Sequence, residues 1–278
     1  MGSLGDIFFD DSLSFMSQAL LLGLLASIPF GTMGSLVVAR RISYLAAAIA
    51  HAVLGGIGFS LFAKHQWEWT WIQPLTGALM VGILAALLVG WISIKHRAYE
   101  DTLIGAIWSL GMAIGLLFIF KTPQYVDPMS YLFGDILMIS SVDITLVLVL
   151  CAIVVGFVIY SYQPLVALCF DEEFAKLRGI QTTSLYLLTL CLVAITIVFL
   201  VSMVGVILVI ALLSLPAAMA GLFSRKLWQM MVGGTVICML FTFLGTWLSY
   251  SWDLPTGPFI ILLCGISYLL MLILKKAR

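Results

Sequence analysis

Charge is what this sequence has least of. Asp, Glu, Lys and Arg make up 9% of its 278 residues, against about a quarter in a typical soluble domain. Hydrophobic residues reach 63%. An apolar run of about 20 residues crosses the hydrocarbon core of a bilayer, so the composition predicts an all-α, polytopic integral membrane protein. The net charge is zero and no basic patch occurs, which argues against a nucleic-acid partner.

The motifs of the common hydrolytic reactions are also missing. No Gly-rich phosphate loop ends in Lys and Ser or Thr, so the chain is not expected to hydrolyse nucleotide itself. A Ser–His–Asp arrangement and a His-Glu-x-x-His helix are absent too, which leaves intramembrane hydrolysis unsupported. The five cysteines have neither metal-ligand nor paired spacing. We therefore expect no enzymatic activity and no permanently bound cofactor.

The apolar runs predict about nine transmembrane helices in one domain that spans residues 1–278. The sixth and seventh are separated only by Met203-Val204-Gly205. They could form a single broken element, so the predicted number of transmembrane helices is eight or nine. The predicted helices are 13–39, 43–63, 72–94, 101–120, 142–162, 183–202, 204–223, 227–250 and 256–274.

Basic residues predict the orientation. In the alternating arrangement of spans, all 13 Lys and Arg residues except Lys64 and Lys121 fall on one side of the membrane. Because positive charge collects on the cytoplasmic side, the N-terminus is expected outside and the C-terminus in the cytoplasm. The same rule puts the connection between the fifth and sixth spans in the cytoplasm.

A charged segment interrupts the apolar sequence at 170–179, within that connection. If it forms a helix, its acidic residues lie in the first turn and its basic residues in the last, which suits the helix dipole. Three apolar residues at i, i+4 and i+7 then share one stripe. The acidic residues are Asp171, Glu172 and Glu173, the basic ones Lys176 and Arg178, the stop Gly179, and the stripe Phe170, Phe174 and Leu177. Two interpretations remain open: a docking site for a partner outside the bilayer, or an ordinary solvated loop helix.

One ionisable side chain, His51, lies at membrane depth in the second span. Such groups are costly in lipid and are therefore functional candidates. His51 shares a helical face with Ala47 and Gly55, so an imidazole projects from a stripe of small residues. It is either a metal-passing ligand, since imidazole suits transition metals, or a neutral histidine that is hydrogen-bonded between helices.

Four further residues carry weaker expectations. Asp135 and Asp143 lie near the outer end of the fifth span, where they either line an outer vestibule or cap a helix at the interface. Gly205 and Pro216 are candidate hinges around the seventh span. Proline interrupts the hydrogen-bond ladder of a helix, and the sequence does not decide between a kink that packing tolerates and a hinge.

Several segments together resemble the membrane permeases of ATP-binding-cassette (ABC) importers for zinc, manganese or iron. The resemblance runs from about residue 31 to 270, in the order and at the spacing of that family. The matching segments are Gly34–Tyr44, Ala50–Leu54, Glu100–Gly105, Tyr131–Leu137, 171–180, Val204–Ala218 and Asp253–Pro258.

The resemblance implies the metal-type ABC importer permease fold and a multi-pass protein of the prokaryotic plasma (inner) membrane. It implies a second permease subunit, identical or not, a cytoplasmic dimer of ATPases and an extracytoplasmic metal-binding protein, with lipid around the bundle. Residues 170–180, within a cytoplasmic segment of about 164–181, match the coupling helix that the ATPase holds. His51 matches the histidine of the transport path, and the transported cargo is a divalent metal ion: zinc, manganese or iron.

One position departs from the family pattern. Relatives with the full pattern carry an aspartate one turn before the histidine, where this chain has Ala47. A path with a histidine and no nearby carboxylate is less suited to a hard ion, so we expect zinc over manganese or iron. The alternatives are import of a metal chelate or a cobalamin-like cofactor, an ATP-independent carrier, and a membrane scaffold without flux.

Overall fold

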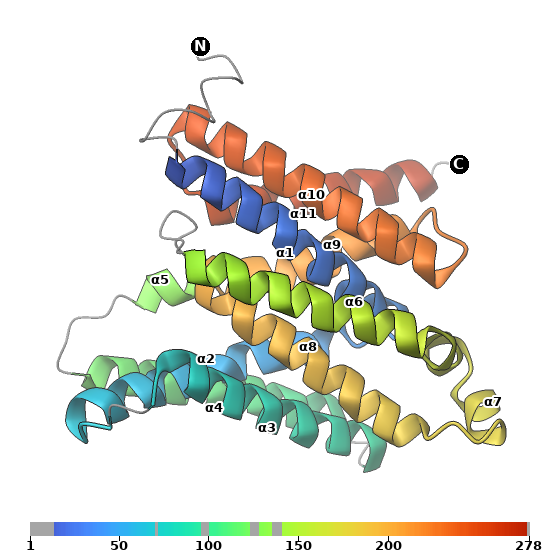
Figure 1. The fold of residues 1–278 in the computed structure, drawn as a ribbon, viewed down its shortest axis with the longest axis horizontal. Coiled ribbons are helices and arrows are strands. Elements are labelled where there is room, and N and C mark those ends of the chain that lie inside the picture. Colours follow the sequence, from blue (N-terminus) through green and yellow to red (C-terminus); the bar gives the residue numbers. More distant parts are fainter. Residues whose placement is uncertain (1–13, 70–71, 96–99, 123–127, 135–140, 277–278) are drawn as a thin grey trace. The chain divides into compact units, whose positions relative to one another are not determined.

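The computed structural model describes residues 14–69, 72–95, 100–122, 128–134 and 141–276, and every regular element in these ranges is a helix (Figure 1). Because lipid offers the backbone no hydrogen-bond partners, a chain this apolar satisfies its amide and carbonyl groups within helices. The helices are α1 (Ser14–Ala39), α2 (Ser43–Gln66), α3 (Pro74–Lys95), α4 (Glu100–Lys121), α5 (Pro128–Phe133), α6 (Ser141–Phe170), α7 (Glu172–Leu177), α8 (Thr182–Val204), α9 (Val206–Gly221), α10 (Leu227–Trp252) and α11 (Thr256–Lys276).

The described residues contain 8 helices that are long and apolar enough to cross a membrane, and α9 is a shorter apolar helix. This confirms the predicted all-α, polytopic architecture. The sixth and seventh predicted spans are two helices, α8 and α9, and the chain leaves helical geometry between them at Gly205, whose φ is 87°. Glycine adopts a positive φ without the steric cost of a Cβ, so the break falls at this residue.

Two predicted connections are more helical than expected. The fifth predicted span ends at residue 162, but α6 continues through Pro164 to Phe170. Residues 121–141 contain the short helix α5. Proline removes one hydrogen bond of the ladder, and α6 remains helical on both sides of Pro164 despite that loss.

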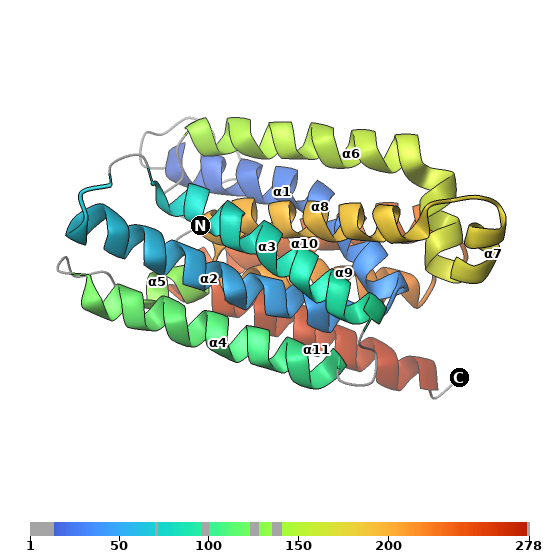
Figure 2. The same ribbon diagram turned by 90° about the horizontal axis from the view of Figure 1, so that it is seen from below.

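The chain divides into two compact units, and each is described here by itself. One comprises residues 39–132 and 161–202. Its centre is α2, which lies between α3 and α4 and is buried along most of its length (Figures 1 and 2). Small residues make this packing close. At Gly55 a Cβ would lie 3.1 Å from the carbonyl oxygen of Gly111 on α4, and α8 packs against Gly82 and Gly90 of α3.

The other unit comprises residues 1–38, 133–160 and 203–278. Within it α9 packs against α10 and α11, which also contact each other. Glycine again allows backbones to approach: Gly34 of α1 lies against the carbonyl group of Leu213 on α9, and Gly245 of α10 lies against Ile260 of α11. In lipid the hydrophobic effect does not drive helices together, so close van der Waals packing at such small residues holds them in contact.

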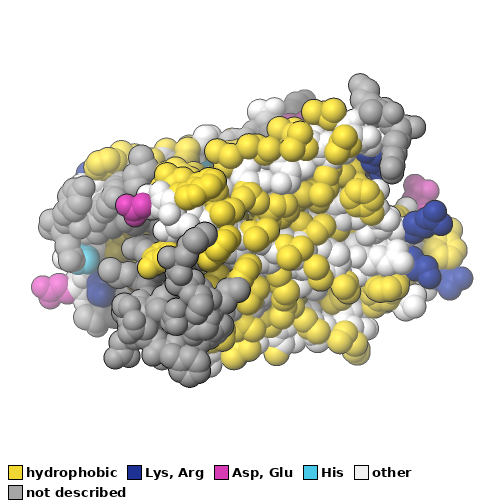
Figure 3. Space-filling view, turned by 90° about the horizontal axis from the view of Figure 1, so that it is seen from above, with side chains coloured by type: hydrophobic (Ala, Val, Ile, Leu, Met, Phe, Trp, Pro, Cys, Tyr) yellow, Lys and Arg dark blue, Asp and Glu magenta, His cyan; other side chains and the backbone are white. Residues whose placement is uncertain are grey.

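Apolar side chains dominate the described part of the face in Figure 3, and charged ones are few. Many Leu, Ile and Phe side chains of α4, α6, α10 and α11 are exposed on the single chain. Two exposed tryptophans, Trp67 and Trp69, lie just after α2 with their ring centroids 5.1 Å apart and their planes tilted by 51°. Aromatic residues of this kind collect at the membrane–water interface. The surface chemistry is that of a membrane protein.

The close contact between α2 and α4 gives a stability prediction. A Cβ at Gly115 of α4 would lie 2.6 Å from the backbone carbonyl of Leu54 on α2, so Gly115→Ala should destabilise the protein by about 1–3 kcal/mol. On the same helix nothing lies within 4 Å of a Cβ at Gly105. Gly105→Ala should be neutral or stabilising, because alanine favours the helix. Thermal unfolding in detergent measures both variants. An unfolding temperature for Gly115→Ala at or above that of the parent would contradict the packing described.

Candidate functional site

The charged segment folds as a short helix with both ends capped. Asp171 is the N-cap of α7, and its Oδ1 accepts a hydrogen bond of 2.9 Å from the Phe174 amide. At the other end the Gly179 amide donates to the Lys176 carbonyl at 3.0 Å and the Ile180 amide to the Ala175 carbonyl at 3.1 Å. This is a Schellman motif with glycine at the left-handed position, and Gly179 has a φ of 78°. The predicted helix stop is confirmed.

The apolar stripe of this segment faces outward. Phe174 is 46% exposed and Leu177 87% exposed, whereas Ala175 is fully buried and anchors the opposite side of α7. Phe170 is 69% exposed but ends α6, one residue before the Asp171 cap. The three apolar residues therefore come from two consecutive helices, which corrects the prediction of one continuous helix. We call Phe170, Phe174 and Leu177 the α7 apolar surface.

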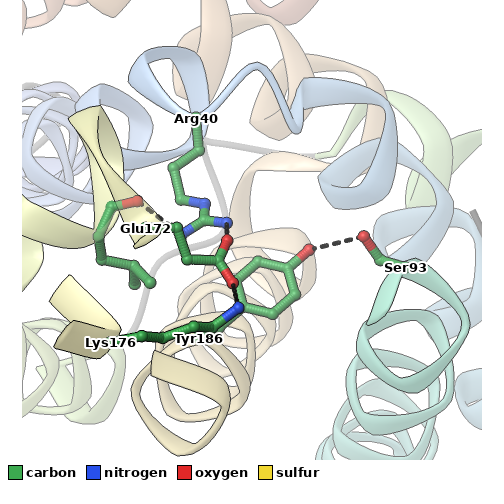
Figure 4. A network of polar contacts seen from close by, with 6 residues as sticks. Arg40, Ser93, Glu172, Lys176 and Tyr186 are labelled. Atoms are coloured by element: carbon green, nitrogen blue, oxygen red, sulfur yellow. Dashed lines mark hydrogen bonds and ion pairs between the residues drawn. The ribbon is translucent and has the colours of Figure 1, made fainter. Parts of the chain in front are cut away.

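Charges hold α7 against its own unit (Figure 4). The Glu172 carboxylate pairs with Lys176 at 2.9 Å and with Arg40 at 3.2 Å. Hydrogen bonding from Lys176, with the Arg40 guanidinium also close, keeps the pKa of Glu172 below its usual range despite partial burial. The carboxylate is therefore charged at neutral pH, and its ion pairs weaken only when the pH falls through that lowered pKa. Arg178 lies over the Phe174 ring, 4.7 Å from its centre. The remaining acidic residue, Glu173, lies in the first turn of α7, near the positive end of the helix dipole.

His51 is buried in the interface between α2 and α4. Its ring stacks on Trp108 of α4 with the centroids 4.6 Å apart and the planes at 10°. Its Nδ1 has no hydrogen-bond partner among the described residues, which does not fit a histidine held by a bond from this atom. The structure contains no group of three or more His, Cys, Asp and Glu side chains able to hold a metal ion, within the ranges it describes.

Only one of the two candidate outer carboxylates lies within the described residues. Asp143 lies in the first turn of α6, where a carboxylate faces the positive end of the helix dipole and stabilises the helix start. Asp135 lies outside the described residues. Asp143 and His51 belong to different units, so each stands here as a separate candidate.

The two candidate hinges lie at different kinds of position. Gly205 separates α8 from α9, and Gly134, which also has a positive φ, approaches the backbone there at the Val204 carbonyl. Pro216 lies inside α9, and the helix runs through it to Gly221. Nearby, the Ser214 hydroxyl donates to the Ile210 carbonyl at 2.7 Å. Gly205 is a true break in the helices, and Pro216 is not.

Sequence reasoning did not find the residues that surround these sites. The contact of Arg40 with Glu172, 132 positions away, was not predicted. Trp108 was not singled out, although it covers the His51 ring. Both contacts join segments far apart in the chain, and a single sequence carries no pattern that pairs them.

Comparison with known proteins identifies the family. Residues 12–275 match the model of the ABC 3 transport family. The chain is 39% identical over 253 residues to a Chlamydia muridarum protein named "Probable metal transport system membrane protein", a match that covers 91% of this chain and 86% of that protein. It is 30% identical over 255 residues to the manganese transport system membrane protein MntC of Listeria monocytogenes, covering 92% and 89%.

The fold agrees with this result. The structure of PsaBC from Streptococcus pneumoniae in complex with a Fab matches 96% of this chain and 95% of that chain with a TM-score of 0.83, at 26% sequence identity. The protein therefore belongs to the ABC 3 transport family and is a membrane permease of the metal-transporting ABC type. The resemblance drawn from its sequence segments is confirmed.

Proposed function

We propose that this permease imports a divalent transition metal, driven by a separate cytoplasmic ATPase that docks on the α7 apolar surface. In this proposal residues 1–278 act as one transmembrane domain in a prokaryotic plasma membrane, with the N-terminus outside and the C-terminus in the cytoplasm. A second permease subunit completes the path, an external binding protein delivers the metal, and lipid surrounds the rest. ATP hydrolysis belongs to the partner, since the chain has no nucleotide-binding motif.

The observation that carries the proposal is the α7 apolar surface. A six-residue helix is far too short to be stable alone, yet α7 has an N-cap, a Schellman motif, an ion pair to Arg40 and one ion pair of its own. These interactions hold two exposed apolar side chains, Phe174 and Leu177, in fixed positions. An ordinary solvated loop helix has no need to display them. Exposed aromatic and aliphatic side chains of this kind serve as anchors in protein interfaces.

The proposed transport path passes His51. Its Nδ1 is buried without a partner among the described residues, and Trp108 fixes the ring plane. A single imidazole without a nearby carboxylate binds an ion weakly, which suits a path that must also release it. Asp135, Asp143 or the second permease subunit would supply further ligands. The break at Gly205 would let α9 tilt as the path opens to either side, and Pro216, which removes one hydrogen bond inside α9, would let that helix bend.

The choice of metal rests on two observations that point in different directions. Ala47 leaves the histidine without the oxygen ligand that a hard ion prefers, which favours zinc. The relative MntC of Listeria monocytogenes is named for manganese, which favours manganese as the second candidate. We propose zinc first, and the uptake measurement below compares the two.

Replacing the α7 apolar surface tests the docking. In the variant Phe174→Ser with Leu177→Ser, each truncation should cost about 1–2 kcal/mol of docking free energy, or about tenfold in affinity. The permease should then lose its ATPase during purification, and metal uptake into proteoliposomes should fall accordingly. The matched control is Phe223→Ser, which removes another exposed aromatic ring, from the turn between α9 and α10. Normal ATPase binding and uptake by the double variant would overturn the proposal.

Replacing His51 tests the path. His51→Ala should bind the ATPase normally but lose uptake of radioactive zinc by at least about tenfold, because removal of the ligand raises the barrier in the path. His65→Ala removes the other histidine of α2, whose Nδ1 lies 2.9 Å from the Leu61 carbonyl, and should transport normally. Unlabelled zinc should compete for uptake more strongly than manganese. Equal uptake by His51→Ala would remove this residue from the mechanism, and stronger competition by manganese would reverse the order of the two metals.

A further inference from the structure

Arg40, in the short connection between α1 and α2, contacts three other parts of its unit (Figure 4). Its Nη1 donates a hydrogen bond of 2.8 Å to the Leu168 carbonyl, and its Nη2 lies 3.2 Å from the Glu172 carboxylate. The guanidinium also lies over the Tyr186 ring, 4.6 Å from its centre. One side chain thus uses its donors and its flat face at the same time, which lysine cannot do.

The first contact fixes the end of α6. The last four carbonyl groups of a helix have no hydrogen-bond partner within it. Because α6 ends at Phe170, the Leu168 carbonyl is one of these four, and Arg40 is its partner. A cation at this end also suits the helix dipole. The Asp171 amide donates back to the Ala167 carbonyl at 2.9 Å, so the turn from α6 into α7 is held on both sides.

The second contact joins α7 to Arg40. Glu172 has two cationic partners, but they differ in exposure: the Lys176 side chain is 56% exposed and the Arg40 side chain 15%. Water screens the pair with Lys176, which lies within α7. The pair with Arg40 is less hydrated and connects different segments, so it is the stronger constraint on where α7 lies. Arg40, Glu172 and Lys176 line a cavity of about 100 Å³ together with Tyr186.

The third contact leads into the membrane helices. Tyr186 lies in the second turn of α8, and its hydroxyl donates to the Ser93 hydroxyl of α3 at 3.2 Å. A continuous set of contacts therefore runs from α7 through Glu172, Arg40 and Tyr186 to Ser93. We call these four residues, with the Leu168 carbonyl, the Arg40 junction.

We infer that Arg40 is a positioning residue that transmits the displacement of α7 to α3 and α8, and so couples ATP turnover to metal movement. The inference rests on the proposed docking of the ATPase at α7 and adds the route by which its motion reaches the membrane helices. Packing alone joins α7 weakly to the rest, because only Ala175 of this helix is buried. The Arg40 junction is the polar connection that the structure shows between α7 and its neighbouring helices, among the residues it describes.

The test measures coupling separately from docking. The permease is reconstituted with its ATPase and binding protein in proteoliposomes, and zinc or manganese uptake is divided by ATP hydrolysed. Arg40→Gln should bind the ATPase and hydrolyse ATP, but its uptake per ATP should fall at least about fivefold, the lower range of measured coupling between sites. Arg40→Lys should restore only part of the coupling, since lysine keeps the charge and loses the forked donors.

The adjacent Arg41 provides the matched control. Arg41→Gln removes the same charge from the same connection at an exposed position, and it should leave uptake per ATP within the error of the parent. Glu172→Gln, on a largely exposed helix, should fold and show the same direction of change as Arg40→Gln. The double variant should have the same uptake per ATP as Arg40→Gln alone, because both changes break the same contact between Arg40 and Glu172.

Each remaining outcome decides a different question. Unchanged uptake per ATP in a folded Arg40→Gln complex overturns the inference, and so does an equal loss in Arg41→Gln. The inference is also overturned if Arg40→Gln loses uptake per ATP only because its unfolding temperature is lower, while Glu172→Gln has normal uptake per ATP. Arg40 would then have a structural role alone. If the parent permease fails to bind any ATPase through α7, the proposed function itself is wrong, and that result is seen before any Arg40 variant is compared.

Discussion

Lipid gives a peptide backbone no hydrogen-bond partners, and the architecture follows from that constraint. Each described span is a helix that satisfies its own amide and carbonyl groups, and helices approach through glycine where close contact is needed. Departures from helix therefore need local compensation. The turn at Asp171 has a side-chain cap, and the Arg40 guanidinium donates to the Leu168 carbonyl just before it. The break at Gly205 uses the conformation that glycine alone adopts freely.

The proposed coupling requires a short helix that keeps its structure under load, and α7 is stabilised in several ways. Its backbone is capped at both ends, its one buried side chain is Ala175, and Glu172 holds it to Arg40. The exposed side is left to Phe174 and Leu177. In the proposed importer, the ATPase binds this exposed side, while Glu172 contacts Arg40, which in turn contacts Leu168 of α6 and Tyr186 of α8, and Tyr186 contacts Ser93 of α3. Docking and transmission then use different faces of the same six residues.

The sequence predicted most of the fold and part of the site, and the physical reasons differ. Long apolar runs, the helix stop at Gly179 and the break at Gly205 are local patterns, and all three are confirmed. The course of α6 past Pro164 was missed, because a proline favours a helix end but costs only one hydrogen bond, and a helix can continue past it. The Arg40–Glu172 pair was missed because it depends on how distant segments meet. For His51, the pattern revealed a polar group in lipid but not its stacking on Trp108.

The central claim is that α7 presents its apolar surface to an ATPase in the cytoplasm. Labelling Leu177→Cys with a membrane-impermeant maleimide tests it most directly, with the parent chain as the measure of labelling at the five native cysteines. We predict labelling in inside-out vesicles, none in intact cells, and protection when the ATPase is bound. Labelling from outside intact cells, or equal labelling with and without the bound ATPase, would contradict the account.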